Sequence, residues 1–168
     1  MVIDIEQNMP SAKLFYLGDE QIKSLDIAEY IKDKSVVIIG VPGAYTPVCT
    51  MNHLPGFVGK ADEIKAEGAD EIICIAPNDP FVVKRWKDEL DPENKITILS
   101  DGNLELTKAL GMELDASGLG LGQRSQRYSM IVKNGVIKTR DVEDEASTVS
   151  VSGAESCLMT ALPNIRAA

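Results

Sequence analysis

Cysteine and histidine are scarce in this sequence, and their scarcity excludes several classes of site. The 168 residues include three cysteines and a single histidine, and no Cys-x-x-Cys pair occurs. A disulfide framework and the common zinc-binding spacings are therefore excluded. We expect a reducing compartment, and neither a metal ion nor another cofactor.

The N-terminal segment lacks the features of a targeting sequence. Residues 1–8 include Asp4 and Glu6, and they contain neither a basic cluster nor an apolar run. No apolar stretch elsewhere is long enough to span a membrane. We expect a cytoplasmic protein without membrane contact, or an organellar one if a presequence has been trimmed.

Positive charge is in the minority, with 17 Lys and Arg against 26 Asp and Glu and a net charge of −9. A surface that binds nucleic acid gathers Lys and Arg, and no such cluster occurs, so we expect no nucleic-acid partner. The composition, 44% hydrophobic and 26% charged, is ordinary for a soluble globular protein. The length fits one domain over residues 1–168.

Hydrophobic periodicity predicts strands that alternate with helices. Gly18-Asp19-Glu20 separates the first two strands, and Asn134-Gly135 predicts a late antiparallel hairpin. Strands separated by helices imply parallel crossovers, so we predict an α/β protein: three α/β/α layers, a mixed sheet and an N-terminal β-hairpin. Strands are expected at 12–16, 22–25, 35–41, 71–76, 96–99, 128–133 and 136–141, and helices near 27–31, 48–68, 80–90, 104–110 and 152–162.

Local signals add detail to this outline. Pro55-Gly56 predicts a kink early in the second helix. We interpret residues 113–123 as a loop and the acidic residues 141–145 as a solvated loop. Ser152-x-x-Glu155 has the spacing of a capping box, which predicts that Ser152 caps the last helix. The Gly118-x-Gly120-x-Gly122 run follows no strand and opens no helix, which excludes a phosphate-binding loop.

Cys49 is the strongest candidate for chemistry. It lies between an uninterrupted apolar strand and a helix, and Pro42 and Pro47 make the connection stiff and extended. Unpaired backbone N–H groups and the positive end of the helix dipole favour a thiolate at such a position. The local pattern thus predicts a nucleophile, with a small buried hydrophobe as the alternative.

The polar residues around Cys49 admit two interpretations each. Thr46 is either a local backbone cap or a hydrogen-bond partner for an oxygen bound beside the sulfur. His53 could share a helix face with Cys49, but one histidine without a matching Asn or Asp does not make a cysteine protease. Arg124 and Arg127 precede a strand, and from the residues alone we interpret both as solvated surface charges.

The other two cysteines differ in their surroundings. Cys74 lies inside the apolar strand 71–76 and is interpreted as a structural thiol. Cys157 neighbours Ala154, Leu158 and Ala161 at helical spacing, near the edge of a buried stripe. For Cys157, both a core residue and a redox partner stay open.

Two motifs then resemble a known family. The run Val-Pro-Gly-Ala-Tyr-Thr-Pro-Val-Cys that ends at Cys49, together with His53-Leu54-Pro55-Gly56-Phe57, is similar to the active-site signature of the peroxiredoxins, specifically the type-5 or type-II (atypical) branch. Tyr45 departs from the pattern, in which Phe is usual. The similarity covers residues 10–165, and its further matches are Asn78-Asp79-x-Phe81-Val82, Trp86, Asp101, Arg127-Tyr128-Ser129-Met130 and Asn134-Gly135.

The resemblance implies a thioredoxin-like fold and the thiol-dependent reduction of hydrogen peroxide and alkyl hydroperoxides. It makes Cys49 the peroxidatic cysteine, whose thiolate attacks a peroxide oxygen and becomes a sulfenic acid. Thr46, the backbone N–H of Cys49 and Arg127 would stabilise the leaving oxygen. Arg127 would also hold the thiolate charge, Pro42 would shield the pocket, and His53 would orient the site.

The resemblance leaves the return to the thiol open. Relatives with an intramolecular resolving cysteine carry it near a Pro-Asn-Ile ending, but alignment on Pro163-Asn164-Ile165 puts Cys157 two residues early. On a helix this offset turns a side chain by about 200°. The alternative to resolution by Cys157 is a one-cysteine cycle in which glutathione, glutaredoxin or thioredoxin is the reductant.

The same kinship implies a homodimer. A hypothesis from another class is a redox sensor that oxidises at Cys49 and signals to a partner. The sequence favours the enzyme, because a sensor does not require Thr46 and Arg127 together around the thiol.

Overall fold

A seven-stranded mixed sheet forms the centre of the protein. The computed structural model describes residues 1–163, so Asn164 and Ile165 of the C-terminal motif lie outside the described residues. The strand order is β2-β1-β5-β4-β3-β8-β9, and β6 and β7 form a separate pair. The strands are β1 Lys13–Gly18, β2 Gln21–Asp26, β3 Ser35–Gly40, β4 Glu71–Ala76, β5 Thr97–Ser100, β6 Glu113–Asp115, β7 Gln123–Ser125, β8 Tyr128–Lys133 and β9 Val136–Val142.

Helical segments connect and cover the strands. Asp26 caps α1 and Asp79 caps α4, each by accepting two backbone N–H bonds. The segments are α1 Ile27–Tyr30, the π-helix η1 Cys49–His53, α2 Leu54–Gly59, α3 Ala61–Ala66, α4 Pro80–Leu90, α5 Glu105–Ala109, the 3₁₀-helix η2 Ser117–Leu119, α6 Ala154–Ser156 and the π-helix η3 Cys157–Ala161.

The pairing confirms the predicted mixed sheet. The strand β3 runs parallel to β4, and β4 runs parallel to β5. Both predicted hairpins, β1–β2 and β8–β9, are antiparallel. Between the two halves, β3 pairs antiparallel with β8, so that Gly40 lies opposite Tyr128. This pairing brings the exit of β3 next to the start of β8.

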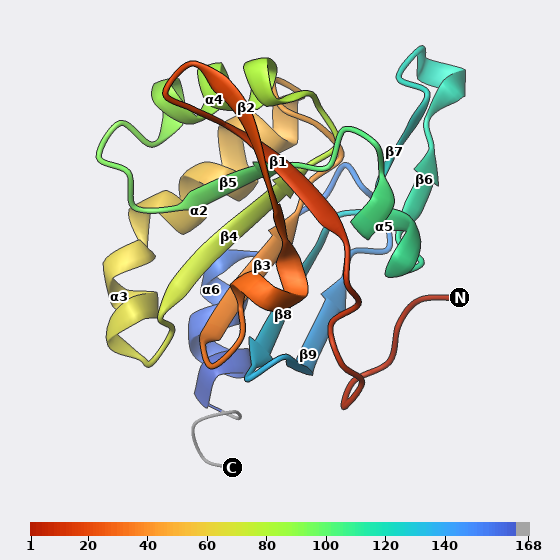
Figure 1. The fold of residues 1–168 in the computed structure, drawn as a ribbon. Helices are drawn as coiled ribbons and strands as arrows, with labels where there is room; N and C mark the ends of the chain where they lie inside the picture. Colours follow the sequence, from red (N-terminus) through yellow and green to blue (C-terminus); the bar gives the residue numbers. More distant parts are fainter. Residues whose placement is uncertain (164–168) are drawn as a thin grey trace.

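Two hydrophobic cores lie on opposite faces of the sheet, which confirms the three-layer prediction. One core includes Phe57 from α2, Trp86 from α4 and Cys157 from η3. The other includes Ile27 from α1 and Leu106 from α5. Figure 1 shows α1 and α5 on the near face of the sheet, with α2, α3 and α6 behind it.

Residues 113–123 are not the plain loop that the sequence suggested. They include β6 and η2, and the strand β6 pairs antiparallel with β7 to form a hairpin that projects from the body in Figure 1. Gly120 and Gly122 have φ angles of 75° and 68°, which permit the reversal. The sequence has no short Asn-Gly or Asp-Gly turn here, so its strand signal was weak.

The start of the second helix is irregular, but not as a kink at Pro55-Gly56. The π turn η1 precedes α2, and the N–H of Leu54 bonds to the carbonyl of Cys49, five residues back. Pro55 has no N–H to donate to the preceding turn, which accounts for the departure from the α pattern. The helix then breaks at Lys60, between α2 and α3.

Two predictions near the C-terminus are wrong for one shared reason. Ser152 is not the cap of the last helix, because the cap position belongs to Gly153 and the Ser152 hydroxyl donates to Glu143 at 2.6 Å. The acidic residues 141–145 are not all solvated, because only 6% of Glu143 is exposed. The shared reason is that the Ser152 hydroxyl bonds to the buried Glu143 carboxylate and not to the N-terminus of the last helix.

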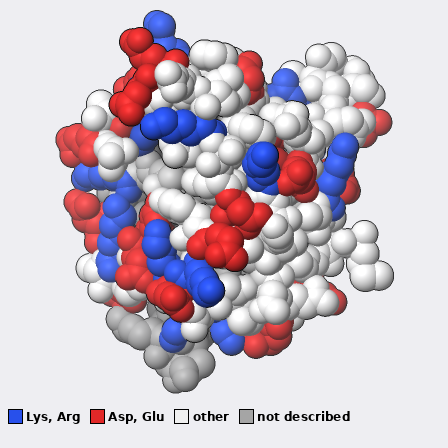
Figure 2. Space-filling model, viewed as in Figure 1, with Lys and Arg blue, Asp and Glu red and all other residues white. Residues whose placement is uncertain are grey.

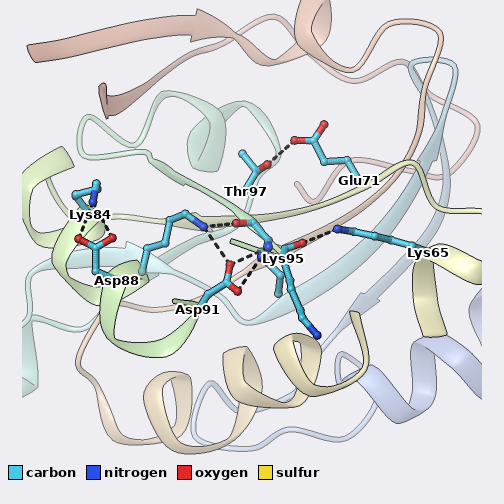
Figure 3. A network of polar contacts seen from close by, with 9 residues as sticks. Lys65, Glu71, Lys84, Asp88, Asp91, Lys95 and Thr97 are labelled. Atoms are coloured by element: carbon cyan, nitrogen blue, oxygen red, sulfur yellow. Dashed lines mark hydrogen bonds and ion pairs between the residues drawn. The ribbon is translucent and has the colours of Figure 1, made fainter. Parts of the chain in front are cut away.

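A polar network fixes the connection between α4 and β5 (Figure 3). The Asp91 carboxylate accepts bonds from the Lys87 ammonium group and from the backbone N–H groups of Lys95 and Ile96. Lys87 also donates to the Ile96 carbonyl at 2.6 Å. This network anchors the helix that carries Trp86.

Charged side chains of both signs are interspersed on the face shown in Figure 2. Basic and acidic groups alternate there over the left and lower parts of the molecule. Within residues 1–163, none of the helices combines the length and apolar character needed to cross a membrane.

Candidate active site

Cys49 lies just beyond the carboxyl end of β3. The strand leads into a loop through Pro42, and the helical segment begins at Pro47, so the cysteine occupies its first turn. The Cys49 side chain is fully buried. The structure therefore places the thiol at the predicted strand-to-helix junction, where the helix N-terminus favours negative charge.

Arg127 lies beside this thiol. It directly precedes β8, and the β3–β8 pairing carries it to the exit of β3. Its Nη2 donates to the Sγ atom of Cys49 at 3.1 Å, its Nη1 lies 3.0 Å from Nδ1 of His53, and its Nε donates to the Ala146 carbonyl at 2.9 Å. Only 1% of Arg127 is exposed, so its interpretation as a solvated surface charge is wrong.

His53 is a neutral acceptor in this arrangement. A guanidinium can only donate, so Nδ1 accepts from Arg127, and Nε2 carries the hydrogen that it donates to the Ser152 carbonyl at 2.9 Å. Burial, aided by the charge of Arg127, lowers the pKa of His53 to about 4. Among the described residues, the ring nitrogens contact Arg127 and the Ser152 carbonyl rather than the sulfur of Cys49.

The loop before Cys49 is held by several backbone contacts. The Thr46 hydroxyl donates to the Gly43 carbonyl at 2.7 Å, and Asn78 accepts from the Ala44 N–H at 2.8 Å. Pro42 is buried, as a shield against water would be. Because the Thr46 hydrogen is committed to Gly43, its oxygen lone pairs remain as acceptors.

Arg124 lies over the same loop and is not simply solvated. Its Nε donates to the Leu121 carbonyl at 2.8 Å, and its Nη1 lies 3.5 Å from the Pro42 carbonyl. A side chain on Gly43 would collide with it, since a Cβ there would lie 2.4 Å from Nη1. Glycine at this position lets the arginine cover the loop.

The other two thiols are held protonated by burial. Cys74 lies within β4 opposite Ile39, and burial raises its pKa strongly. Cys157 begins η3 with 2% of its surface exposed, and burial together with the charge of Asp141 raises its pKa to about 12. All three cysteines, which lie within the described residues, are free thiols.

Sequence reasoning missed the carboxylate behind His53. Glu143 follows β9 and accepts hydrogen bonds from the backbone N–H and the hydroxyl of both Ser150 and Ser152. Burial acts to raise its pKa, but the bonds from the two serines outweigh it and lower the pKa to about 2. An acidic residue at the end of a strand, followed by closely spaced serines, is the signal that could have indicated it.

Among residues 1–163, no group of three or more His, Cys, Asp or Glu side chains is placed to hold a metal ion. The chemistry that this geometry offers is that of a buried thiol beside a fixed guanidinium.

Comparisons with known proteins show the family of the chain. The Redoxin family matches residues 5–158. The chain is 42% identical over 161 residues to peroxiredoxin-2E-2, chloroplastic, from Oryza sativa subsp. japonica, a match that covers 93% of this chain and 71% of that protein. It is 43% identical over 145 residues to peroxiredoxin-2C from Arabidopsis thaliana, covering 86% and 88%. The chain belongs to the peroxiredoxin family.

Solved peroxiredoxin structures confirm the fold of this peroxiredoxin. Reduced Prx3 from Vibrio vulnificus superposes with a TM-score of 0.89 at 41% identity and covers 96% of this chain and 99% of that one. Peroxiredoxin 5 from Alvinella pompejana gives 0.84 at 31% identity, covering 96% and 99%. This peroxiredoxin thus has the thioredoxin-like fold of the type-II/type-5 branch and is a thiol-dependent peroxidase.

Proposed function

We propose that this peroxiredoxin reduces hydrogen peroxide and alkyl hydroperoxides through the thiolate of Cys49. The 3.1 Å bond from Arg127 to Sγ supports this assignment most directly. Sγ attacks one peroxide oxygen, the S–O bond forms as the O–O bond breaks, and the second oxygen leaves as water or an alcohol after it takes up a proton. The sulfur is oxidised to a sulfenic acid and the peroxide is reduced.

In this proposal, Arg127 and Thr46 make different interactions with the peroxide. Arg127 carries a permanent charge that stabilises the thiolate and then the oxygen that leaves. The Thr46 hydroxyl, whose hydrogen goes to Gly43, accepts a hydrogen bond from the peroxide O–H. The resemblance implied that Thr46 stabilises the leaving oxygen, and this proposal instead makes its hydroxyl an acceptor from the peroxide. Pro42 keeps water from the pocket.

A one-cysteine cycle is the favoured route back to the thiol. Cys157 is buried in η3, and with a pKa of about 12 it is a poor nucleophile at neutral pH. An external thiol, from glutathione with glutaredoxin or from thioredoxin, attacks the sulfenic sulfur, releases water and forms a mixed disulfide. A second thiol then releases the Cys49 thiolate.

Intact-mass analysis under non-reducing conditions tests the whole cycle. One equivalent of hydrogen peroxide is added to the wild-type protein and to the Cys49→Ser, Cys74→Ser and Cys157→Ser variants, and peroxide consumption is followed in parallel. We expect a sulfenic adduct on the wild type, on Cys74→Ser and on Cys157→Ser, and no peroxide consumption by Cys49→Ser. If Cys49→Ser consumed peroxide at the wild-type rate, the mechanism would be wrong.

The same experiment decides the route of recycling. A mass loss of two hydrogens with a Cys49–Cys157 linkage would establish a two-cysteine cycle instead. Addition of glutathione should otherwise yield a mixed disulfide on Cys49. We further propose a homodimer, which light scattering of the reduced and oxidised protein tests.

A further inference from the structure

A buried carboxylate, that of Glu143, is linked to the sulfur of Cys49 by four successive contacts. Both oxygens of Glu143 accept hydrogen bonds: from Ser150, through its N–H at 2.7 Å and its hydroxyl at 2.7 Å, and from Ser152, through its N–H at 2.9 Å and its hydroxyl at 2.6 Å. Among the described residues, the hydrogen-bond partners of this carboxylate are these two serines. Glu143 therefore fixes the backbone of residues 150–152.

That backbone carries the acceptor for His53. Ser152 is fully buried, and its carbonyl takes the Nε2 hydrogen of the imidazole at 2.9 Å. The other ring nitrogen, Nδ1, lies 3.0 Å from Nη1 of Arg127, whose Nη2 donates to Cys49. The contacts thus form one continuous path from Glu143 through Ser152, His53 and Arg127 to the sulfur.

The sheet holds both ends of this path in register. Gly40 at the end of β3 lies opposite Tyr128, and Tyr128 lies opposite Val142. Arg127 and Glu143 flank this row of residues, and the N–H of Glu143 donates to the Arg127 carbonyl at 3.0 Å. The acid is therefore tied to the arginine by a backbone bond as well as by the side-chain path.

We propose that Glu143 is a positioning residue for peroxide reduction: by fixing Ser152, it holds His53 as the Nε2–H tautomer, which aims Arg127 at Cys49. The proposal rests on the proposed roles of Cys49 and Arg127. An imidazole has two neutral tautomers, and the bond made by one nitrogen decides whether the other can accept. With the Nδ1–H tautomer, two N–H donors would face each other and the guanidinium would turn away from the sulfur.

Among residues 1–163, the charges that act on His53 are those of Arg127 and Glu143. His53 faces the charge of Arg127 on one side and that of Glu143 beyond Ser152 on the other. The pKa of Asp141 is raised mainly by burial and to a smaller extent by the negative charge of Glu143. Burial keeps His53 neutral near neutral pH, so the tautomer rather than the charge of the ring is the property to be fixed.

The Glu143→Gln variant tests the proposal. An amide has the shape of the carboxylate but only one acceptor oxygen, so it cannot accept from all four serine donors. Glu145→Gln is the matched control, because Glu145 is exposed and its replacement removes the same charge. His53 is the only histidine, so its ¹⁵N imidazole signals need no assignment and report the tautomer directly.

We expect the wild type and Glu145→Gln to show the Nε2–H tautomer alone between pH 6 and 8. Glu143→Gln should show a mixture of tautomers, and its single-turnover rate with hydrogen peroxide should fall roughly 10- to 100-fold, as for a misplaced catalytic group. A folded Glu143→Gln protein with one tautomer would overturn the proposal. So would a mixture of tautomers with an unchanged rate, because positioning would then be irrelevant to the reaction.

A second variant covers the case in which Glu143→Gln does not fold. Ser152→Ala removes one hydroxyl donor to Glu143 and keeps the carbonyl that His53 uses. We expect a smaller shift of the tautomer ratio in the same direction, and no shift would refute the proposal. The tautomer is read without peroxide, so failure of Cys49→Ser to stop peroxide consumption would refute the proposed function while leaving this result to stand.

Discussion

Arg127 donates through Nη2 to Sγ of Cys49 at 3.1 Å, although 78 positions separate the two residues in the chain. The contact exists because β3 and β8 pair directly, so that the exit of one strand meets the entry of the other. Neither residue alone indicates a peroxide-reducing site. A thiolate next to a fixed, permanent positive charge does, because both the attacking sulfur and the leaving oxygen carry negative charge.

Replacement of Arg127 by lysine should show how much of the reaction rate depends on the several N–H donors of the guanidinium and not on its charge alone. A lysine keeps the charge but cannot reach Cys49, His53 and the Ala146 carbonyl together. We expect the rate constant for peroxide to fall about 10²- to 10³-fold, the effect of losing one such donor. Arg140→Lys, near the N-terminal segment, is the control and should react at the wild-type rate.

Single-turnover fluorescence is the suitable measurement for this comparison. Trp86 is the only tryptophan, and its indole N–H donates to the Thr50 hydroxyl at 3.0 Å, one residue from Cys49. Oxidation of the sulfur should therefore change its emission. A lysine variant that keeps the wild-type rate would show that charge alone is enough.

The Thr46 hydroxyl is tested by a pair of substitutions. Thr46→Val removes the bond to Gly43 and the oxygen proposed to accept from the peroxide, whereas Thr46→Ser keeps both. We expect the valine variant to lose roughly 10²-fold in the rate constant for peroxide and the serine variant to retain most of it. Equal rates for the two variants in stopped-flow assays would exclude the hydroxyl from the reaction.

The sequence predicted the sheet well because its signals are local. Asn134 and Gly135 have φ angles of 55° and 81°, the two positive values that a type I′ hairpin turn requires, and both residue types favour such values. Asp26 and Asp79 cap their helices within three residues. Features of this kind depend on neighbours in the chain, so composition and spacing suffice to predict them.

The features that could not be predicted depend on distant parts of the chain. Ser152 and Glu155 have the spacing of a capping box, but Glu143 competes for the serine once β9 brings the acid to it. Burial of Arg127 follows from the β3–β8 pairing, which no local pattern reveals. From the residues alone Cys49 was a candidate, and only the resemblance pointed to Thr46 and Arg127 as its partners.

Tyr128→Phe probes an unusual feature beside the site. The Tyr128 hydroxyl is buried and, among the described residues, has no hydrogen-bond partner. Removal of an unsatisfied buried polar group should leave stability unchanged or raise it by about 1 kcal/mol. Urea unfolding measures the difference, and a loss of more than about 1 kcal/mol would reveal a partner such as a bound water molecule.

Gly40 opposite that tyrosine should tolerate no side chain. A Cβ at Gly40 would lie 2.0 Å from the Tyr128 ring, which is fully buried and cannot move aside. We expect Gly40→Ala to lower the free energy of unfolding by about 1–3 kcal/mol or more, as overpacking of a core does. Gly59→Ala is the control, because its Cβ would meet no atom within 4 Å. Equal stability of the two variants would contradict the packing.

Acid should destabilise the protein in two steps that belong to named residues. The pKa of His53 is about 4 in the folded protein and about 6.5 in the unfolded chain, so the unfolded state binds the proton first as the pH falls. Stability is therefore lost between pH 6.5 and 4, by roughly 3 kcal/mol in all. Glu143, with a pKa of about 2, contributes stability that is lost as the pH falls from about 4.5 towards 2.

The His53→Asn variant separates these two steps, because the protein has no other histidine. Urea unfolding from pH 7 to 4 gives the free energy of unfolding as a function of pH. The slope for the variant should be smaller than that for the wild type, by an amount that corresponds to at most one bound proton, because asparagine does not titrate. Below pH 4 the two curves should run parallel, because Glu143 titrates in both proteins. Identical slopes between pH 6.5 and 4 would mean that His53 keeps an ordinary pKa, and its role as a neutral acceptor for Arg127 would then be lost in mildly acidic solution.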